Sequence, residues 1–257
     1  MAIITISRQI GSLGDEIAKA LANKLGYQRI EKPQVGAVLS EHGFSASDID
    51  KYDETNPSLL QHLSIQKNIY GHLIRAAVYE FAANDNAVIV GRGAQVILKD
   101  IPGTFHVRVF APYTTRVNRL MDQKRDEKKN AEWDIRQSDR NSSGYIHTYF
   151  NVDWDDSELY DLVLNTRTMT LNNCVEMIMG TVCSDEFKKS DQVTEKLVDL
   201  SLTQKAKAVM LEVEGVEKPE LVVQNGIAHL SESGMSLELK EACEKAVLNI
   251  RGIIKIG

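Results

Sequence analysis

Two glycines near the start of the chain, Gly11 and Gly14, lie between a β-branched apolar run and an amphipathic stretch, in ITISRQIGSLGDEIAKAL. A turn of this kind leaves unpaired N–H groups at the positive end of a helix dipole, an arrangement that binds anions. The full phosphate-binding loop reads GxxxxGK[ST], in which lysine contacts the phosphates and the hydroxyl binds magnesium. Aligning its last glycine with Gly14 puts Gln9 at the first glycine, Asp15 at the lysine and Glu16 at the hydroxyl residue. The spacing therefore indicates a phosphate-binding loop without its usual cation.

A structural interpretation of the same residues stands beside this one. Ser12 and Asp15 have the spacing of a capping box, in which Ser12 caps the helix and Asp15 accepts from the Ser12 N–H. Asp15 and Glu16 also suit the helix dipole, by about 0.3–1 kcal/mol each. The loop alone leaves both interpretations open.

Arginines further along the chain favour an anion. Arg92 lies in VGRG, after a predicted buried strand, at the sheet edge where open α/β proteins bind ligands. Two further pairs have helical spacing, so the members of each share a helix face, and such arginines can bind phosphate oxygens through both branches of the guanidinium. These pairs are Arg116 with Arg119, and Arg136 with Arg140, the latter beside Asp139.

The elements around these residues predict a parallel sheet. Buried strands are expected in IITIS, YQRI, AVIVG, FHVRVFA and YDLVLNT, with helices between them, the longest over 57–83. The charged stretch 116–141 indicates a helical hairpin. After a polar segment, helix, strand pair, helix and strand follow in turn, and Asn225-Gly226 predicts a hairpin turn. We predict a domain over 1–182, a linker over 183–192 and a small α/β domain over 193–257.

Composition limits the class of protein. A net charge of −6 argues against general nucleic-acid binding. Three separated cysteines and the absence of a leader or a spanning segment lead us to expect a cytoplasmic protein. The six histidines lack metal-ligand spacing, so we expect no protein metal site. Trp133 and Trp154 are interpreted as packing anchors.

With these pieces together, residues 2–180 resemble the cytidylate kinase-like family of P-loop proteins. The marks are ITISRQIGSLGDEIAKALANKLGY, VIVGRGAQVIL and DRNSSGYIHTYFNVDWDDSELYDLVLNT. The resemblance implies a P-loop kinase-like parallel sheet with helices on both faces and a helical lid. The family's loop reads like GSGGREIA, so the lysine is habitually absent, but here Asp15 replaces an arginine and Leu13 a glycine.

The resemblance also implies roles for the candidate residues. The turn of the phosphate loop matches Gly11, Ser12 and Gly14, followed by Asp15 and Glu16, and Arg8 is the nearest cation that could replace the lysine. Arg92 matches the arginine that holds a monophosphate acceptor. Lid residues that approach the transferring phosphoryl group match Arg116, Arg119, Arg136 and Arg140, with Asp139 orienting one of them. Asp161 and Asn165 are interpreted as structural.

Residues 193–257 resemble a BON-type domain through LVVQNGIAHLS, a helix and NIRGIIKI. Such modules are associated with phospholipid surfaces or small ligands. A structural or dimerising appendage is an equal alternative, and a peripheral lipid contact through this tail stays open.

Three functions follow from these observations. The first is an enzyme that transfers a phosphoryl group from ATP, with Mg²⁺, to a CMP-like nucleoside monophosphate. The second is a nucleotide-binding sensor without turnover, coupled to the C-terminal domain. The third is a scaffold with a purely structural kinase-like part. The arginines favour nucleotide binding over the scaffold, and we favour the enzyme. The sequence does not determine the acceptor or the oligomeric state.

Overall fold

A computed structural model describes residues 2–54, 64–84, 86–125, 127–231 and 235–257. The chain forms two compact units. The first combines Met1–Gln34, Asp53–Pro57 and Asp85–Ser190, and the second combines Val35–Tyr52, Ser58–Asn84 and Asp191–Gly257.

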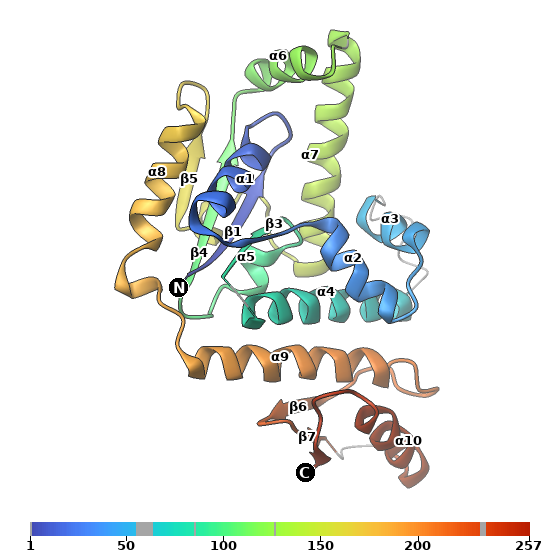
Figure 1. The fold of residues 1–257 in the computed structure, drawn as a ribbon. Coiled ribbons are helices and arrows are strands. Elements are labelled where there is room, and N and C mark those ends of the chain that lie inside the picture. The colour runs from blue at the N-terminus through green and yellow to red at the C-terminus, as the bar shows by residue number, and fades with distance from the viewer. Residues whose placement is uncertain (1, 55–63, 85, 126, 232–234) are drawn as a thin grey trace. The chain divides into compact units, whose positions relative to one another are not determined.

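The first unit is built on a sheet of five parallel strands in the order β2-β3-β1-β4-β5 (Figure 1). Every predicted strand of this sheet is present. The apolar residues of the inner strands β1 and β3 are buried because a parallel sheet is covered on both faces, whereas Val163 of the edge strand β5 is 45% exposed. The strands are β1 (Ile3–Arg8), β2 (Gln28–Ile30), β3 (Ala87–Val90), β4 (Thr104–Phe110) and β5 (Leu162–Asn165).

Helices cover this sheet. α1 (Gly14–Leu25) and α8 (Leu171–Val182) pack against each other, and their core includes Ile4 and Ile6 of β1. The short helix α5 (Ala94–Ile97) also contacts β1. The sequence prediction of an α/β fold with a parallel sheet is confirmed.

The charged stretch forms the predicted helical hairpin. α6 (Tyr113–Lys124) and α7 (Lys128–Phe150) pack through a small core that contains Val117, Leu120, Ala131 and Ile135. The role of this hairpin as a lid stays a prediction.

The second unit is organised around two long helices, α4 (Ser64–Asn84) and α9 (Asp191–Met210), which pack along each other. α2 (Lys32–Glu41) lies mainly in this unit, as does α3 (Ala46–Glu54). Of the helix predicted over 57–83, the part over 57–63 falls outside the described residues.

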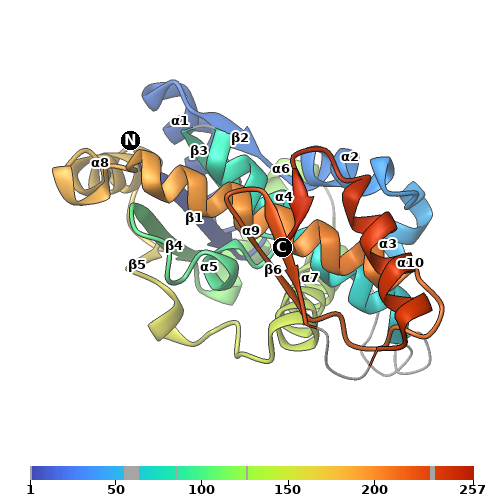
Figure 2. The same cartoon turned by 90° about the horizontal axis from the view of Figure 1, so that it is seen from below.

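The C-terminal part of this unit has the predicted order of elements. β6 (Leu221–Gln224) and β7 (Ile227–Leu230) form an antiparallel hairpin, α10 (Leu237–Leu248) follows, and β8 (Lys255–Ile256) pairs in parallel with β7. Both β6 and α10 contact α9 (Figure 2). That residues 193–257 form a BON-type domain stays a prediction.

The compact units divide the chain differently from the predicted segments 1–182, 183–192 and 193–257. α9 packs on α4, which precedes β3, so the C-terminal elements share a unit with residues from the first third of the chain. Within the predicted linker, a short 3₁₀ turn covers Asp185–Phe187 and α9 begins at Asp191.

Candidate functional site

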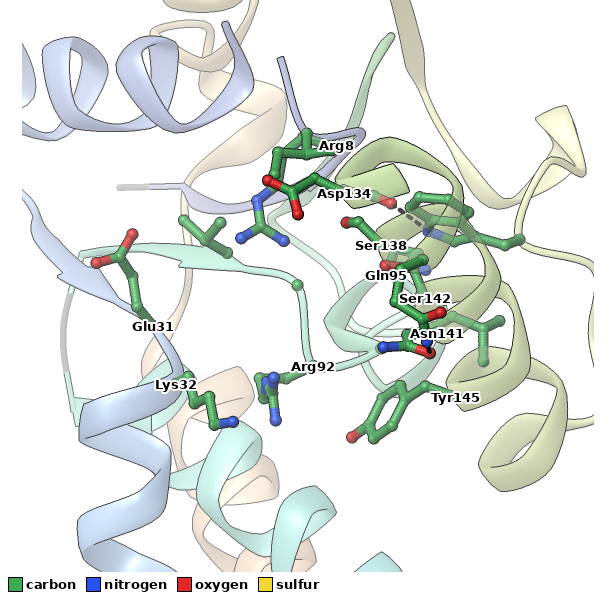
Figure 3. A pocket seen from close by; sticks show the side chains of 18 of the residues that line it. Arg8, Glu31, Lys32, Arg92, Gln95, Asp134, Ser138, Asn141, Ser142 and Tyr145 are labelled. Carbon is green, nitrogen blue, oxygen red and sulfur yellow. Dashed lines mark hydrogen bonds between the residues drawn. The ribbon is translucent and has the colours of Figure 1, made fainter. Parts of the chain in front are cut away.

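A cavity of about 690 Å³ lies in the first unit, at the carboxyl ends of β1 and β3 (Figure 3). This is the edge at which open parallel sheets bind ligands. Four cations from different segments line it: Arg8 at the end of β1, Lys32 at the start of α2, Arg92 after β3 and Lys124 at the end of α6. The structure thus brings together Arg8 and Arg92, two residues that the sequence singled out.

The loop before α1 has the shape of an anion-binding turn. Gly11 and Leu13 both have left-handed backbone conformations, with φ of 75° and 65°, and the helix begins at Gly14. In the described part of the chain, the backbone N–H groups of residues 13–16 donate to no backbone carbonyl. A left-handed residue followed by a helix start forms a concave nest of N–H groups that suits a phosphate.

The capping-box interpretation is wrong. Leu13, not Ser12, is the N-cap residue, and no side chain caps the helix. Ser12 is buried, and its hydroxyl donates to the carbonyl of Val109 at 3.2 Å. The carboxylate of Asp15 accepts from Arg8 instead of the Ser12 N–H. These partners outweigh the local capping geometry, so no cap side chain accepts a hydrogen bond from the N–H groups at the helix start.

Arg8 connects the loop to the cavity. Its Nε donates to Asp15 Oδ1 at 2.8 Å, and its side chain crosses directly over Gly14, where an added Cβ would lie 2.3 Å from Arg8 Cβ. The guanidinium then extends toward Gly91, where an added Cβ would lie 3.3 Å from Nη1. Both glycines therefore make room for this arginine, which places a cation close to the position of the missing lysine.

Three consecutive residues after β3, Gly91, Arg92 and Gly93, have left-handed backbones with φ of 73°, 58° and 68°. This conformation is uncommon for a non-glycine residue and gathers at ligand sites. The turn directs Arg92 into the cavity, with its guanidinium carbon 5.5 Å from the centre of the Tyr145 ring (Figure 3). Gly93 has to be small, because an added Cβ would lie 2.2 Å from the Phe150 ring.

The face of α7 that lines the cavity is largely neutral and polar. It presents Gln137, Ser138, Asn141 and Ser142, with Asp134 nearer its start. Gln137 Nε2 donates to Asn141 Oδ1 at 2.9 Å, which holds both amides in place. Gln95, whose side chain is buried, also lines the cavity.

The remaining candidate arginines do not line the cavity. Arg116 is buried and makes a bidentate ion pair with Asp139, at 2.9 and 2.7 Å, so Asp139 does orient one arginine of the hairpin. Arg119 donates to the carbonyls of Gly11 and Thr166. Direct contact of either arginine with a phosphoryl group stays a prediction.

Arg136 and Arg140 are exposed on α7. Arg136 donates to the Tyr113 hydroxyl at 3.2 Å and to Glu132 at 3.3 Å. Their predicted common helix face is therefore not the face that lines this cavity. Their catalytic roles also stay predictions.

A buried cluster under the cavity escaped the sequence reasoning. Arg108 of β4 is 4% exposed and stacks on Trp154, with its guanidinium carbon 3.7 Å from the ring centre. It donates to Ser7 at 2.9 Å and to Asp155 at 2.5 Å. Burial lowers the pKa of Arg108, and the nearby Tyr160 and Asp155 oppose that shift. The run NVDWDDSELY was the available signal, because it supplies Trp154 and Asp155.

The two tryptophans differ. Trp154 is buried and donates its indole N–H to Ser7 at 2.9 Å, which confirms it as a packing anchor. For Trp133 that interpretation is wrong, because its side chain is 65% exposed and lines the cavity. Asp161 and Asn165 accept from the backbone N–H groups of His106 and Arg167, as structural residues do.

The donor set suits magnesium only when phosphates are present. Among the described residues, no three His, Cys, Asp or Glu side chains gather as a metal site. Mg²⁺ is commonly bound by one or two carboxylates together with substrate phosphates, and Asp15 and Glu16 are exposed at the loop.

The sequence profile of the cytidylate kinase-like family matches residues 3–168, which include the loop, the VGRG turn and the hairpin. The chain belongs to the cytidylate kinase-like family. The family assignment and the fold together make it a nucleotide kinase-like protein.

Individual relatives are distant. A cytidylate kinase from Archaeoglobus fulgidus is 26% identical over 188 residues, which cover 72% of this chain and 96% of that enzyme. A uronate isomerase from Corynebacterium glutamicum is 30% identical over 100 residues, and that match covers 39% of this chain but 19% of the isomerase. A crystal structure of an uncharacterized protein from Eubacterium ventriosum has a TM-score of 0.54 at 24% identity, covering 70% of this chain and 97% of that chain. The last likeness shows the shared fold.

A second cavity, of about 530 Å³, lies in the other unit between α4, α9 and the β6–β7 turn. The turn has φ of 52° at Asn225 and 72° at Gly226, as the hairpin prediction requires, and both N–H groups donate to Asp199. None of the helices in the described part of the chain combines the length and apolar character needed to cross a bilayer.

Proposed function

We propose that this protein transfers the γ-phosphoryl group of ATP to a nucleoside monophosphate, with CMP as the first acceptor to test. The observation that carries the proposal is the convergence of three cations, Arg8, Lys32 and Arg92, on one cavity beside a helix start whose N–H groups are open to an anion. Phosphoryl transfer depends on positioning and on stabilisation of negative charge, and this arrangement supplies both.

The donor would be held by the loop. Its phosphates would accept hydrogen bonds from the N–H groups of residues 13–16, and the guanidinium of Arg8 would take the part of the missing lysine. Asp15 and Glu16 would hold Mg²⁺ together with those phosphates. When bound, the metal neutralises phosphate charge and orients the transferred group.

The acceptor would lie on the Arg92 side of the cavity. Arg92 and Lys32 would bind its phosphate, since the left-handed turn fixes the backbone from which Arg92 projects. The amides and hydroxyls on α7 would contact the rest of the acceptor. The exposed Trp133 would shield the cavity mouth from water.

Turnover tests this proposal. We would incubate the protein with ATP, Mg²⁺ and CMP and follow CDP and ADP by ³¹P NMR, then repeat with other monophosphates. Arg8→Ala should lower kcat/KM by about 10- to 100-fold, because a hydrogen bond to a charged group contributes about 1.5–3 kcal/mol. Lys19→Ala, which removes an exposed cation from α1, is the control and should retain activity.

One observation favours a second candidate, a nucleotide-binding sensor without turnover. The carboxylate at the lysine position already pairs with Arg8, which is the cation that should replace that lysine. Binding of ATP without formation of any nucleoside diphosphate, across the whole panel of acceptors, would support this candidate against the enzyme.

A further inference from the structure

Three successive carbonyl groups of the phosphate loop are held from behind by side chains. Arg116 Nη1 lies 3.5 Å from the Ile10 oxygen, and Arg119 Nη1 donates to the Gly11 oxygen at 3.2 Å. The hydroxyl of Thr166 donates to the Ser12 oxygen at 2.8 Å. The loop backbone therefore depends on donors from α6 and from the end of β5.

Thr166 is the centre of this arrangement. It is fully buried, and its backbone N–H donates to Phe110 at 2.9 Å, which anchors it beside β4. Arg119 donates to the Thr166 hydroxyl at 3.0 Å and to its carbonyl at 2.6 Å. Two carbonyls lie within reach of the Thr166 hydroxyl proton, that of Ser12 at 2.8 Å and that of Phe110 at 3.4 Å, and the shorter distance makes Ser12 its main acceptor.

The direction of these bonds decides what the loop presents to a ligand. In a trans peptide the C=O and the following N–H point in opposite directions. With the Ser12 carbonyl turned toward Thr166, the N–H of Leu13 points to the opposite side. That N–H begins the series at residues 13–16 that donates to no backbone carbonyl in the described part of the chain. A rotated peptide would put a carbonyl oxygen there, which repels phosphate.

Leu13 makes this control necessary. Its backbone is left-handed, with φ of 65°, a conformation that is unfavourable for a residue with a Cβ atom. Leucine at this position therefore favours other loop conformations, in which the N–H groups would not be arranged to bind an anion. The carbonyl bonds from Thr166 and Arg119 oppose that change.

We propose that Thr166 and Arg119 are positioning residues that hold the phosphate loop in its anion-binding conformation. The inference rests on the proposed nucleotide-binding function. In this proposal Arg119 stabilises the loop backbone through the Gly11 carbonyl and Thr166, and it does not contact the phosphoryl group. Thr166, which the sequence reasoning passed over, becomes a determinant of ATP affinity.

The test compares Thr166→Val with Thr166→Ser by calorimetric titration with ATP and, separately, with CMP. Valine keeps the shape and removes the hydroxyl, so ATP binding should weaken about tenfold or more while CMP binding changes less than twofold. Serine restores the hydroxyl and should bind ATP within twofold of the wild type. Thr181→Val on α8, whose hydroxyl donates to the Met177 carbonyl of the same helix, is the control for the same chemical change and should leave ATP binding unaltered.

Two results would overturn the inference: ATP affinity of Thr166→Val within twofold of the wild type, or equal losses for ATP and CMP, which is the mark of general destabilisation. If Thr166→Val does not fold, Arg119→Lys replaces it, since this half-buried position tolerates the change and loses the two-branched contact. It should show the same selective loss for ATP. Failure of the wild type to bind ATP would instead overturn the proposed function, and this inference with it.

Discussion

The carboxylate at the lysine position offers the sharpest test of how this loop deals with charge. Asp15 is about half exposed and pairs with Arg8 at 2.8 Å. Two unit charges 4 Å apart interact by about 1 kcal/mol in water and about 4 kcal/mol near a protein surface. For an exposed carboxylate the lower figure applies, and about 1 kcal/mol corresponds to about a fivefold change in Kd. Asp15→Asn should therefore tighten ATP binding in the absence of Mg²⁺ about fivefold, because it removes repulsion and releases Arg8.

Asp15→Asn should also reduce the factor by which Mg²⁺ increases the affinity for ATP, since one carboxylate near the metal is lost. It should also lower the free energy of unfolding by about 0.5–2 kcal/mol, because an acidic residue at a helix start contributes about 0.3–1 kcal/mol and an exposed ion pair about 0.2–1 kcal/mol. Calorimetric titrations with ATP, in EDTA and in Mg²⁺, measure both effects. Asp100→Asn removes one exposed charge elsewhere in the unit and serves as the control. Unchanged or weaker metal-free binding in Asp15→Asn would refute the reasoning.

Three further predictions concern other parts of the molecule. Arg92→Ala should weaken binding of the monophosphate about tenfold or more and leave ATP binding nearly intact, as measured by separate titrations; equal loss of both would exclude its acceptor role. Gly93→Ala should cost about 2–5 kcal/mol in urea unfolding, because its Cβ would meet Phe150 at 2.2 Å on a left-handed backbone, whereas Gly180→Ala, with open space around it, should cost nothing. Burial lowers the pKa of His106 below its usual value of 6.5, so its contribution to stability is fully present above about pH 6.5 and is lost as the pH falls; Tm should drop between pH 7.5 and 5.5, and a rise would contradict this.

Local patterns were sufficient to predict most of the fold. The β-branched runs gave the buried strands of the parallel sheet, and Asn225-Gly226 gave the β6–β7 turn because only left-handed residues fit it. The units could not be predicted in the same way. The packing of α4 on α9 joins residues more than a hundred positions apart. Periodicity in either helix predicts a buried face but not the element that packs against it.

Two of the four cations that line the cavity were predicted from the sequence, whereas Lys32 and Lys124 were not. Arg8 and Arg92 stand at strand ends, where sequence reasoning can find them, and both line the cavity. Asp15 could take part in a capping box with Ser12 or in an ion pair with Arg8. Which of the two forms depends on the position of the Arg8 side chain, and sequence spacing does not determine that position. Arg108 was hidden because a charged residue inside FHVRVFA resembles an exposed position of the strand, although Trp154 and Asp155 bury and balance it. The spacing of Arg136 and Arg140 predicted that both lie on one face of a helix, but it did not predict whether that face lines the cavity.

The central claim is that a loop without lysine still binds a nucleoside triphosphate, through Arg8 and through the N–H groups of residues 13–16, which donate to no backbone carbonyl among the described residues. Calorimetric titration of the full chain with ATP, with and without Mg²⁺, tests it most directly. We predict micromolar binding that depends on Mg²⁺ and is weakened about 10- to 100-fold in Arg8→Ala. The absence of binding at millimolar ATP would contradict the account and leave SRQIGSLGDE as a helix start without a phosphate ligand.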